Sequence, residues 1–301
     1  MKRKFYNYLQ NLQDSITSKI EKIDGKSTFK EDLWSHHENG GGRTRVISDG
    51  SIFEKGGVNI SSITGTLPKI MQSQLKTKNK NFSACGLSIV FHPLNPMIPT
   101  IHFNIRYFEM LDLSGNKCDQ WFGGGVDLSP YYIFENDVIL FHKNCKKICD
   151  KYGDNLYEEY KKKCDAYFWN SHRNEARGVG GLFFDYLKDT QKKSIKEWFL
   201  FVKELGDNFL KIYLTIVDKR KKMAFTKSEK KWQEIRRGRY AEFNLIHDKG
   251  TLFGIKTKGR IESIMMSLPP TVRWEYNFSP KHGTKEEKLI SALKKPKKWI
   301  K

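Results

Sequence analysis

The chain has 301 residues, of which 38% are hydrophobic and 13% aromatic, so it can bury a sizeable core and is not disordered as a whole. Lysine and arginine number 54 and aspartate and glutamate 34, which gives a formal net charge of +20. This charge is compatible with nucleic acid, an anionic membrane surface or a polyanionic small molecule as the partner. It is spread along the chain without a recognisable nucleic-acid-binding module, and we interpret it as a solvated basic surface.

The cysteines and the first residues indicate the compartment. Five cysteines are odd in number and lack CxxC spacing, which is typical of reduced cytosolic thiols and not of disulfides or a zinc site. Residues 1–16 are basic but contain no continuous apolar stretch followed by a small-residue cleavage site. No run approaches the roughly 18 apolar residues that would cross a bilayer. We therefore expect a soluble cytoplasmic protein without membrane insertion.

The first predicted elements are helical. Apolar residues recur every three or four positions over residues 3–24, which predicts an amphipathic helix that ends near Gly25. A second, short helical start is predicted around residues 29–34.

A hairpin and a loop follow. The glycines at 40–42 do not belong to a Walker or a dinucleotide-binding motif. Arg43 and Arg45, which come next, would share one face of a strand, and Asp49-Gly50 predicts the turn into a second strand. Residues 61–80 are polar and irregular, and we expect a mobile loop there.

Two central strands are predicted within residues 84–110, joined by a segment with three prolines. In the second strand, apolar odd positions alternate with polar even positions, a period of two that indicates one buried and one wet face. The polar positions are His102, Asn104 and Arg106, and the first strand adds Ser88 and His92 on one face. Such a row indicates a lined cleft, although ordinary pairing on a sheet surface is the alternative.

The polar row has residue types suited to binding and proton transfer. Arg106 offers a planar fork for a carboxylate or phosphate, and Asn104 offers both a donor and an acceptor. His102 is able to move a proton near neutral pH.

A glycine-rich stretch follows the polar connection at 112–120. Three glycines at 123–125 come after two aromatic residues, and we interpret them as a turn that leaves room for another group. Asp127 lies between apolar neighbours after these glycines. Its carboxylate could accept hydrogen bonds from N–H groups of a ligand, or it could cap the turn or helix that follows.

The rest of the chain alternates helices with short strands. The predicted helices cover residues 135–151, 154–170, 194–219 and 228–238, and a buried strand ends at Asp185. Residues 240–247 and 251–256 are predicted as a strand hairpin, and residues 282–301 as a C-terminal helix with a basic tail.

Two further features are candidates for ligand binding. The turn at 257–260 contains Lys258, Gly259 and Arg260, which could clamp a second carboxylate. Four histidines could hold a divalent metal ion if the fold brought them together, but no two of them have the i, i+4 spacing: His92, His102, His142 and His172.

Four strings are specific enough to indicate a family: FHPLNPMIPTIHFNIRYF, WFGGGVDLSPYY, HRNEARGVGGLFFDYL and YAEFNLIHDKGTLFGIKTKGRIESIMMSLPPTVRWEY. Together they resemble the oxygen-dependent coproporphyrinogen-III oxidases, in particular the bacterial cytosolic branch. The resemblance runs in unbroken order from the first helix to about Trp299.

The resemblance implies a fold and a reaction. The expected fold is a single α/β (α+β) domain over residues 1–301, a large flat antiparallel sheet with helices on both faces, working as a homodimer through residues 242–277. The expected reaction converts two propionates of coproporphyrinogen III to vinyl groups, giving protoporphyrinogen IX in haem biosynthesis with release of carbon dioxide and hydrogen peroxide. Dioxygen is the co-substrate and no organic cofactor is implied.

The resemblance also assigns roles. Residues that match the family's substrate contacts are Ser88, Asn104, Ile105, Arg106, Lys258, Gly259 and Arg260. His102 matches the proton donor, and Asp127 matches a carboxylate that holds the pyrrole N–H groups. The four histidines match divalent-metal ligands of bacterial members, with direct reaction between substrate and dioxygen as the alternative. Lys258 departs from the family, which usually has glycine there.

Two other function classes are weighed against this one. A basic nucleic-acid-binding module is motivated by the charge of +20 and would show steeply salt-dependent association. A dioxygen-independent metallohydrolase is motivated by the four histidines, and metal analysis would reveal it. The resemblance favours the oxidase, without nucleic acid as a partner.

Overall fold

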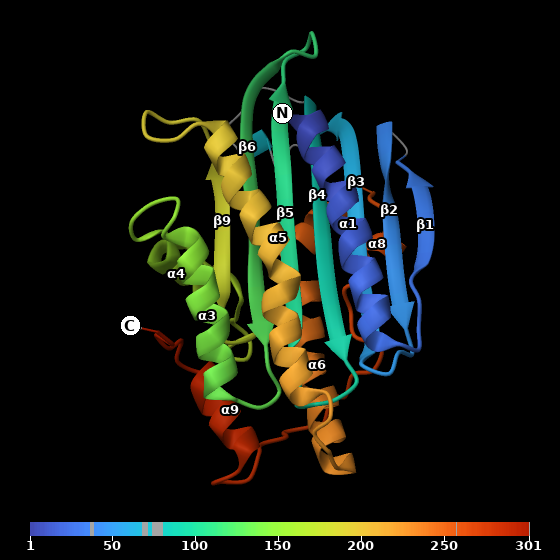
Figure 1. Ribbon diagram of the computed structural model, residues 1–301, viewed down its shortest axis with the longest axis vertical. Coiled ribbons are helices and arrows are strands. Elements are labelled where there is room, and N and C mark those ends of the chain that lie inside the picture. The colour runs from blue at the N-terminus through green and yellow to red at the C-terminus, as the bar shows by residue number, and fades with distance from the viewer. Residues whose placement is uncertain (37–38, 68–71, 74–80, 257, 301) are drawn as a thin grey trace.

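The computed structural model describes residues 1–36, 39–67, 72–73, 81–256 and 258–300 (Figure 1). Its centre is a seven-stranded sheet in the order β1-β2-β3-β4-β5-β6-β9, with every neighbouring pair antiparallel. The strands are β1 (Lys30–Ser35), β2 (Asn39–Ser48), β3 (Phe53–Thr66), β4 (Asn81–Pro93), β5 (Thr100–Leu111), β6 (Lys117–Ser129) and β9 (Gly181–Leu187). A separate pair consists of β7 (Trp169–Asn170) and β8 (Glu175–Ala176).

Helices lie on both faces of the sheet. Those in the described residues are α1 (Lys2–Asp24), α3 (Glu135–Cys149), α4 (Leu156–Tyr167), α5 (Ile195–Arg220), α6 (Lys227–Ile246), α7 (Lys249–Lys256), α8 (Ile261–Met265) and α9 (Lys285–Leu293). In Figure 1, α1, α3 and α5 run in front of the sheet, and α6 and α8 lie behind it. The α/β class, the large antiparallel sheet and the helices on both faces are therefore confirmed.

The face of the sheet under α1, α3 and α5 is apolar, and we call it the apolar face. On β5 it carries Ile101, Phe103 and Ile105, which are at most 1% exposed. Phe103 stacks on Phe209 of α5 with ring centroids 4.6 Å apart. Burying several large side chains in this layer stabilises the fold by about 2 kcal/mol each, so this face fixes the position of the sheet.

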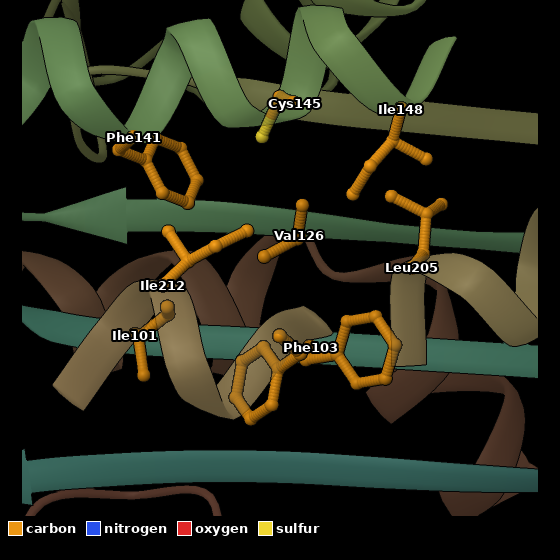
Figure 2. A pocket seen from close by; sticks show the side chains of 9 residues that line it. Ile101, Phe103, Val126, Phe141, Cys145, Ile148, Leu205 and Ile212 are labelled. Atoms are coloured by element: carbon orange, nitrogen blue, oxygen red, sulfur yellow. The ribbon is translucent and has the colours of Figure 1, made fainter. Parts of the chain in front are cut away.

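One small apolar cavity remains in this layer (Figure 2). Phe141, Cys145 and Ile148 of α3 extend from one side, and Val126 and Leu205 lie across from them. No polar side chain lines the cavity, so it is a packing gap in the core and not a reactive centre.

The opposite face, which we call the polar face, is held to α6 and α8 by hydrogen bonds. The Gln233 amide of α6 donates to the Pro93 carbonyl over 2.9 Å, and Ser263 of α8 shares a 2.7 Å hydrogen bond with Thr44 of β2. Because these contacts lie at one end and one side of the sheet, the middle of the polar face keeps half-buried side chains.

Most predicted helices and strands are confirmed, including the helix that ends at Gly25, whose φ of 71° is the left-handed conformation that glycine favours. The short helix at residues 29–34 is wrong, because this segment pairs with β2 as an edge strand. The strand hairpin at residues 240–256 is also wrong. Tyr240 and Phe243 are three positions apart and both are buried, which fits one face of a helix. They belong to α6, and α7 follows it.

Two other predictions change. The glycines at 123–125 lie within strand β6 and do not form a turn. Residues 61–66 belong to β3, and most of the remaining loop prediction, at 68–71 and 74–80, lies outside the described residues. Among the residues that the structure describes, no helix is both long and apolar enough to cross a membrane.

Candidate functional site

The strand register brings the predicted polar residues together. Directly paired residues of neighbouring antiparallel strands point to the same face. On this face His102 pairs with Asp127, Asn104 pairs with Ser88 and Gly125, and Arg106 pairs with Gly86 and Gly123. His102, Asn104, Arg106 and Ser88 are all half-buried. The side chain of Ile105 lies on the apolar face and is 0% exposed, so any substrate contact of this residue involves its backbone.

Asp127 is the centre of a buried ionic network. Arg177 donates to both of its carboxylate oxygens, at 2.7 and 2.8 Å, and Nδ1 of His102 lies 2.8 Å from Oδ1. Burial alone would raise the pKa of Asp127, but the charge of Arg177 and the hydrogen bond with His102 lower it overall. The carboxylate is therefore ionised, and it holds His102 with Nδ1 as the donor. Asp127 does not cap the following segment.

Arg177 was missed by the sequence analysis. Its side chain is 2% exposed, and its guanidinium lies over the rings of Phe168, Tyr240 and Phe243 at 4.0–4.8 Å. Nη1 also donates to Asn244 over 2.8 Å. The one available signal was an arginine directly before a run of glycines, which does not reveal a partner 50 positions away.

Arg106 is anchored but accessible. Its Nη2 donates to Asp185 of β9 over 2.7 Å, and its side chain is 35% exposed. A Cβ on Gly123 would lie 2.5 Å from Asp185 Oδ1 and 2.9 Å from Arg106 Nη2, so any larger residue would displace this pair where it crosses β6. Asp185 was predicted only as the end of a strand, although a carboxylate on an apolar strand is a signal for such a pair.

Arg260 lies on the same face as Arg106. It begins α8 and forms an ion pair with Asp32 of β1, and its side chain is 35% exposed. Asp32 pairs with Thr44, which contacts α8 through Ser263. The strand that carries Asp32 (β1) and the strand that carries Arg106 (β5) are four strand spacings of about 4.8 Å apart, roughly 19 Å across the sheet.

Lys258 and Gly259 form the turn before Arg260. Lys258 has a φ of 56°, the left-handed conformation that glycine adopts more easily. The backbone N–H of Gly259 donates to the Gly254 carbonyl over 2.8 Å, and an added Cβ would lie 2.9 Å from that oxygen. The turn is therefore tight even with lysine in place of the family's usual glycine.

Small side chains cover the sheet between the two arginines. Gly42, Ser61 and Gly86 follow one another across β2, β3 and β4 in the row that ends at Arg106. The next row consists of Thr44, Asn59, Ser88 and Asn104. Trp34 and Ser263 cover the β2 end of these rows, where Thr44 is 4% exposed. The rest of the band has low side chains with hydrogen-bonding groups and lies between the two cations, which suits a broad, flat ligand with several carboxylates.

The structure does not bring the four predicted metal ligands together. His92 and His142 are fully buried, and each uses both ring nitrogens in hydrogen bonds, with Thr100 and Ser267 and with Tyr157 and Val179 respectively. Burial lowers the pKa of both, that of His142 to about 3.

His142 comes from α3 on the apolar side of the sheet, whereas His102 is on the polar face. His172 lies 2.8 Å from both His247 and Glu242. Within the described ranges, no group of three or more histidine, cysteine, aspartate or glutamate residues could hold a metal ion. The four histidines of one chain do not fit a shared centre, and metal binding by them stays a prediction.

Comparison with known proteins shows the family of the chain. The family described as "Coproporphyrinogen III oxidase" matches residues 4–299. The chain is 47% identical over 310 residues to "Coproporphyrinogen-III oxidase 1, chloroplastic" of Arabidopsis thaliana, covering 100% of this chain and 80% of that protein. It is 46% identical over 310 residues, with the same coverage, to "Oxygen-dependent coproporphyrinogen-III oxidase, chloroplastic" of Glycine max.

Proposed function

The chain belongs to the coproporphyrinogen III oxidase family, and from this premise we propose how its polar face carries out the reaction. The enzyme oxidatively decarboxylates coproporphyrinogen III with dioxygen, in haem biosynthesis. Each turnover converts one propionate, –CH₂–CH₂–COOH, and O₂ into a vinyl group, CO₂ and H₂O₂. Two such steps give protoporphyrinogen IX.

The observation that carries this proposal is the shared position of Arg106 and Arg260. Both lie on the polar face and both are 35% exposed. They can bind propionates at opposite sides of one macrocycle while the tetrapyrrole lies over the band of small residues. Lys258 adds a second cation beside Arg260, and Ser88 and Asn104 offer hydrogen bonds beneath the ring.

His102 and Asp127 are proposed to handle the protons. A base removes a pyrrole proton, dioxygen adds to the electron-rich ring, and the resulting peroxide takes the hydrogen next to the ring as carbon dioxide leaves. Asp127, ionised and held by Arg177, orients His102 so that Nε2 can donate or relay a proton. The resemblance also makes Asp127 the partner of the pyrrole N–H groups, and this role stays a prediction, because its carboxylate is 1% exposed and both oxygens already accept hydrogen bonds.

The dependence on dioxygen gives the test. Purified protein should convert coproporphyrinogen III to vinyl product in air, with one H₂O₂ and one CO₂ for each vinyl group. Anaerobic incubation should give no product. Anaerobic turnover supported by a methionine-derived radical cofactor would contradict the proposal.

Dimerisation through residues 242–277 is also proposed. Seven exposed apolar side chains lie in or beside this stretch of the sequence: Leu245, Ile246, Ile255, Ile261, Trp274, Tyr276 and Phe278. Ile246 is 54% exposed and Tyr276 fully so, and such a group of apolar residues is typical of an interface between subunits. Sedimentation should give a dimer, and Ile246→Asp should yield monomers, whereas the same change at exposed Leu113, outside the segment, should not.

The remaining assignments are proposals with direct tests. We propose one domain over residues 1–301, a cytoplasmic location and membership of the bacterial branch, although the relatives described above are chloroplastic. The location is tested by cell fractionation. Metal analysis of protein purified without chelator tests the predicted divalent ion, and no step above requires it.

A further inference from the structure

A second small cavity, polar where the first is apolar, borders Arg177. Its lining includes Thr100, Ser129, Tyr131, Arg236 and Tyr240, all more than nine-tenths buried. It lies between the end of β6 and helix α6. Its volume of ≈ 10 Å³ is about what one water molecule needs.

Three polar atoms at this cavity have no hydrogen-bond partner among the residues that the structure describes. They are Ser129 Oγ, Arg177 Nε and Tyr240 Oη, and all three residues line the cavity. The Asn244 side chain lies near enough to the Tyr240 hydroxyl to lower its pKa, but outside hydrogen-bond geometry. A buried polar group that stays unsatisfied costs about 1–3 kcal/mol. Three such groups facing one polar space are the surroundings in which proteins bind internal water.

The hydrogen bonds of Arg177 show why its Nε matters. Nη2 donates to both oxygens of Asp127, and Nη1 donates to Asn244. The faces of the guanidinium are covered by rings, including those of Phe168 and Tyr240 at 4.0 and 4.5 Å. Nε is the one nitrogen of this guanidinium without a hydrogen-bond partner among the described residues, and whatever it binds helps to set the orientation in which Arg177 holds Asp127.

The charges around the cavity favour a neutral guest. Arg177 is paired with Asp127, and Arg236 is paired with Glu175 over 2.8 Å. Both cations are buried against their own carboxylates, at 2% and 5% exposure, so an added ion would lose its hydration without gaining a free counter-charge. Burial raises the pKa of Tyr240, so its hydroxyl stays protonated at neutral pH and is able to donate as well as accept.

We propose that this cavity binds one water molecule, which accepts from Arg177 Nε and joins the Ser129 and Tyr240 hydroxyls. Through this water, Ser129 and Tyr240 are positioning residues for Arg177 and hence for Asp127. The water site itself stands on the cavity and its polar atoms. The effect on catalysis rests on the function proposed above.

A crystal structure of the wild-type protein tests the site without any assay. We expect one water about 2.7–3.2 Å from Arg177 Nε and from at least one of the two hydroxyls. A dry cavity, or Arg177 Nε bonded to another protein group, would overturn the proposal. An ion in the same place would overturn it too.

Matched variants test the positioning role. Ser129→Thr and Ser129→Val add the same bulk but differ in the hydroxyl, and Tyr240→Phe removes only the hydroxyl of the tyrosine. We expect Ser129→Val and Tyr240→Phe to lower kcat about tenfold, the equivalent of one hydrogen bond, with KM within about twofold. The acidic limb of their kcat profile should move to higher pH, because a less firmly held Arg177 lowers the pKa of Asp127 less. Ser129→Thr should restore most of the activity.

Each result has a distinct meaning. Ser129→Val and Tyr240→Phe with wild-type kcat and pH profile would overturn the positioning role. A general loss of stability that Ser129→Thr shares with Ser129→Val would also overturn it, since bulk and not the hydroxyl would then be responsible. Wild-type protein inactive on coproporphyrinogen III would reject the proposed function, and the crystal structure would still decide on the water.

Discussion

The two faces of strand β5 carry alternating residues of one short segment but have different roles. On the apolar face, Ile101 and Phe103 are 1% exposed and contact α3 and α5. On the polar face, His102 and Arg106 are half-buried and bound to carboxylates of β6 and β9 respectively. Alternation along a strand thus places the residues that hold the fold and the residues proposed for the chemistry one position apart.

The largest expected effect is a loss of stability caused by a substitution on the apolar face. Phe103→Ala should lower the free energy of unfolding by about 3–5 kcal/mol, because it removes buried ring contacts and leaves a cavity. Its control is Asn104→Ala, the next residue on the polar face, which should cost less than about 1 kcal/mol. Urea unfolding measures both. Equal losses at the two positions would contradict the division of roles between the faces.

A carboxylate on the polar side of the sheet should control stability in acid. Glu242 of α6 accepts hydrogen bonds from Arg173, Arg239 and Trp274. Burial raises its pKa, but these donors and His172 outweigh burial and lower the pKa to about 2. A pKa below the unfolded value means that the stabilisation is present above about pH 4.5 and is lost as the pH falls toward 2.

The prediction is that Glu242→Gln flattens this dependence. Wild-type protein should lose up to about 3 kcal/mol of stability between pH 4.5 and 2 through this residue, and the variant should lack that part of the slope. Chemical unfolding at several pH values measures it. Parallel curves for the two proteins would show that Glu242 does not titrate with unfolding.

The next effect concerns binding on the polar face. Arg106→Ala should lower kcat/KM by about 30-fold, equivalent to about 2 kcal/mol, if the propionate pair is desolvated. Stability should change by less than about 1 kcal/mol because the ion pair with Asp185 is half-exposed. Tyr107→Phe, on the apolar face, is the control and should leave KM unchanged. An unchanged KM and rate for Arg106→Ala would remove this arginine from the site.

The smallest expected effect lies at the edge of the polar face. Lys258→Gly should raise the free energy of unfolding by up to about 1 kcal/mol, because glycine adopts the positive φ of this position without a Cβ penalty. Lys258→Ala keeps the penalty and removes the charge, so it should give no gain. Thermal unfolding compares the three proteins, and equal stability of both variants would argue against backbone strain.

Local patterns were sufficient for much of the fold. The helix that ends at Gly25 and the alternation along β5 follow from the sequence because helical and extended periods differ, and each places apolar residues on one side. The segment at 29–34 failed because an edge strand is decided by the neighbour with which it pairs. The segment at 240–256 failed because β-branched and aromatic residues there favour a strand until the packing surface is known.

The candidate site also contains residues that the sequence could predict and residues that it could not. The residues Ser88, His102, Asn104 and Arg106 could be predicted from alternation and family resemblance, and the register brings them together. The partner of Arg106 could not be predicted: Asp185 is 79 positions away, and no local signal joins the two residues. The resemblance also assigned four histidines to one centre, whereas the sheet separates His142 from His102.

The sequence by itself determined which residues would face the core, which would face the site and to which family the chain belongs, because these depend on residue type and spacing along the chain. Only the tertiary structure decided that Arg177 would be buried against Asp127 and would face a polar cavity with Ser129 and Tyr240. Such contacts depend on where distant segments meet in space, and the number of residues between two segments does not tell whether they meet.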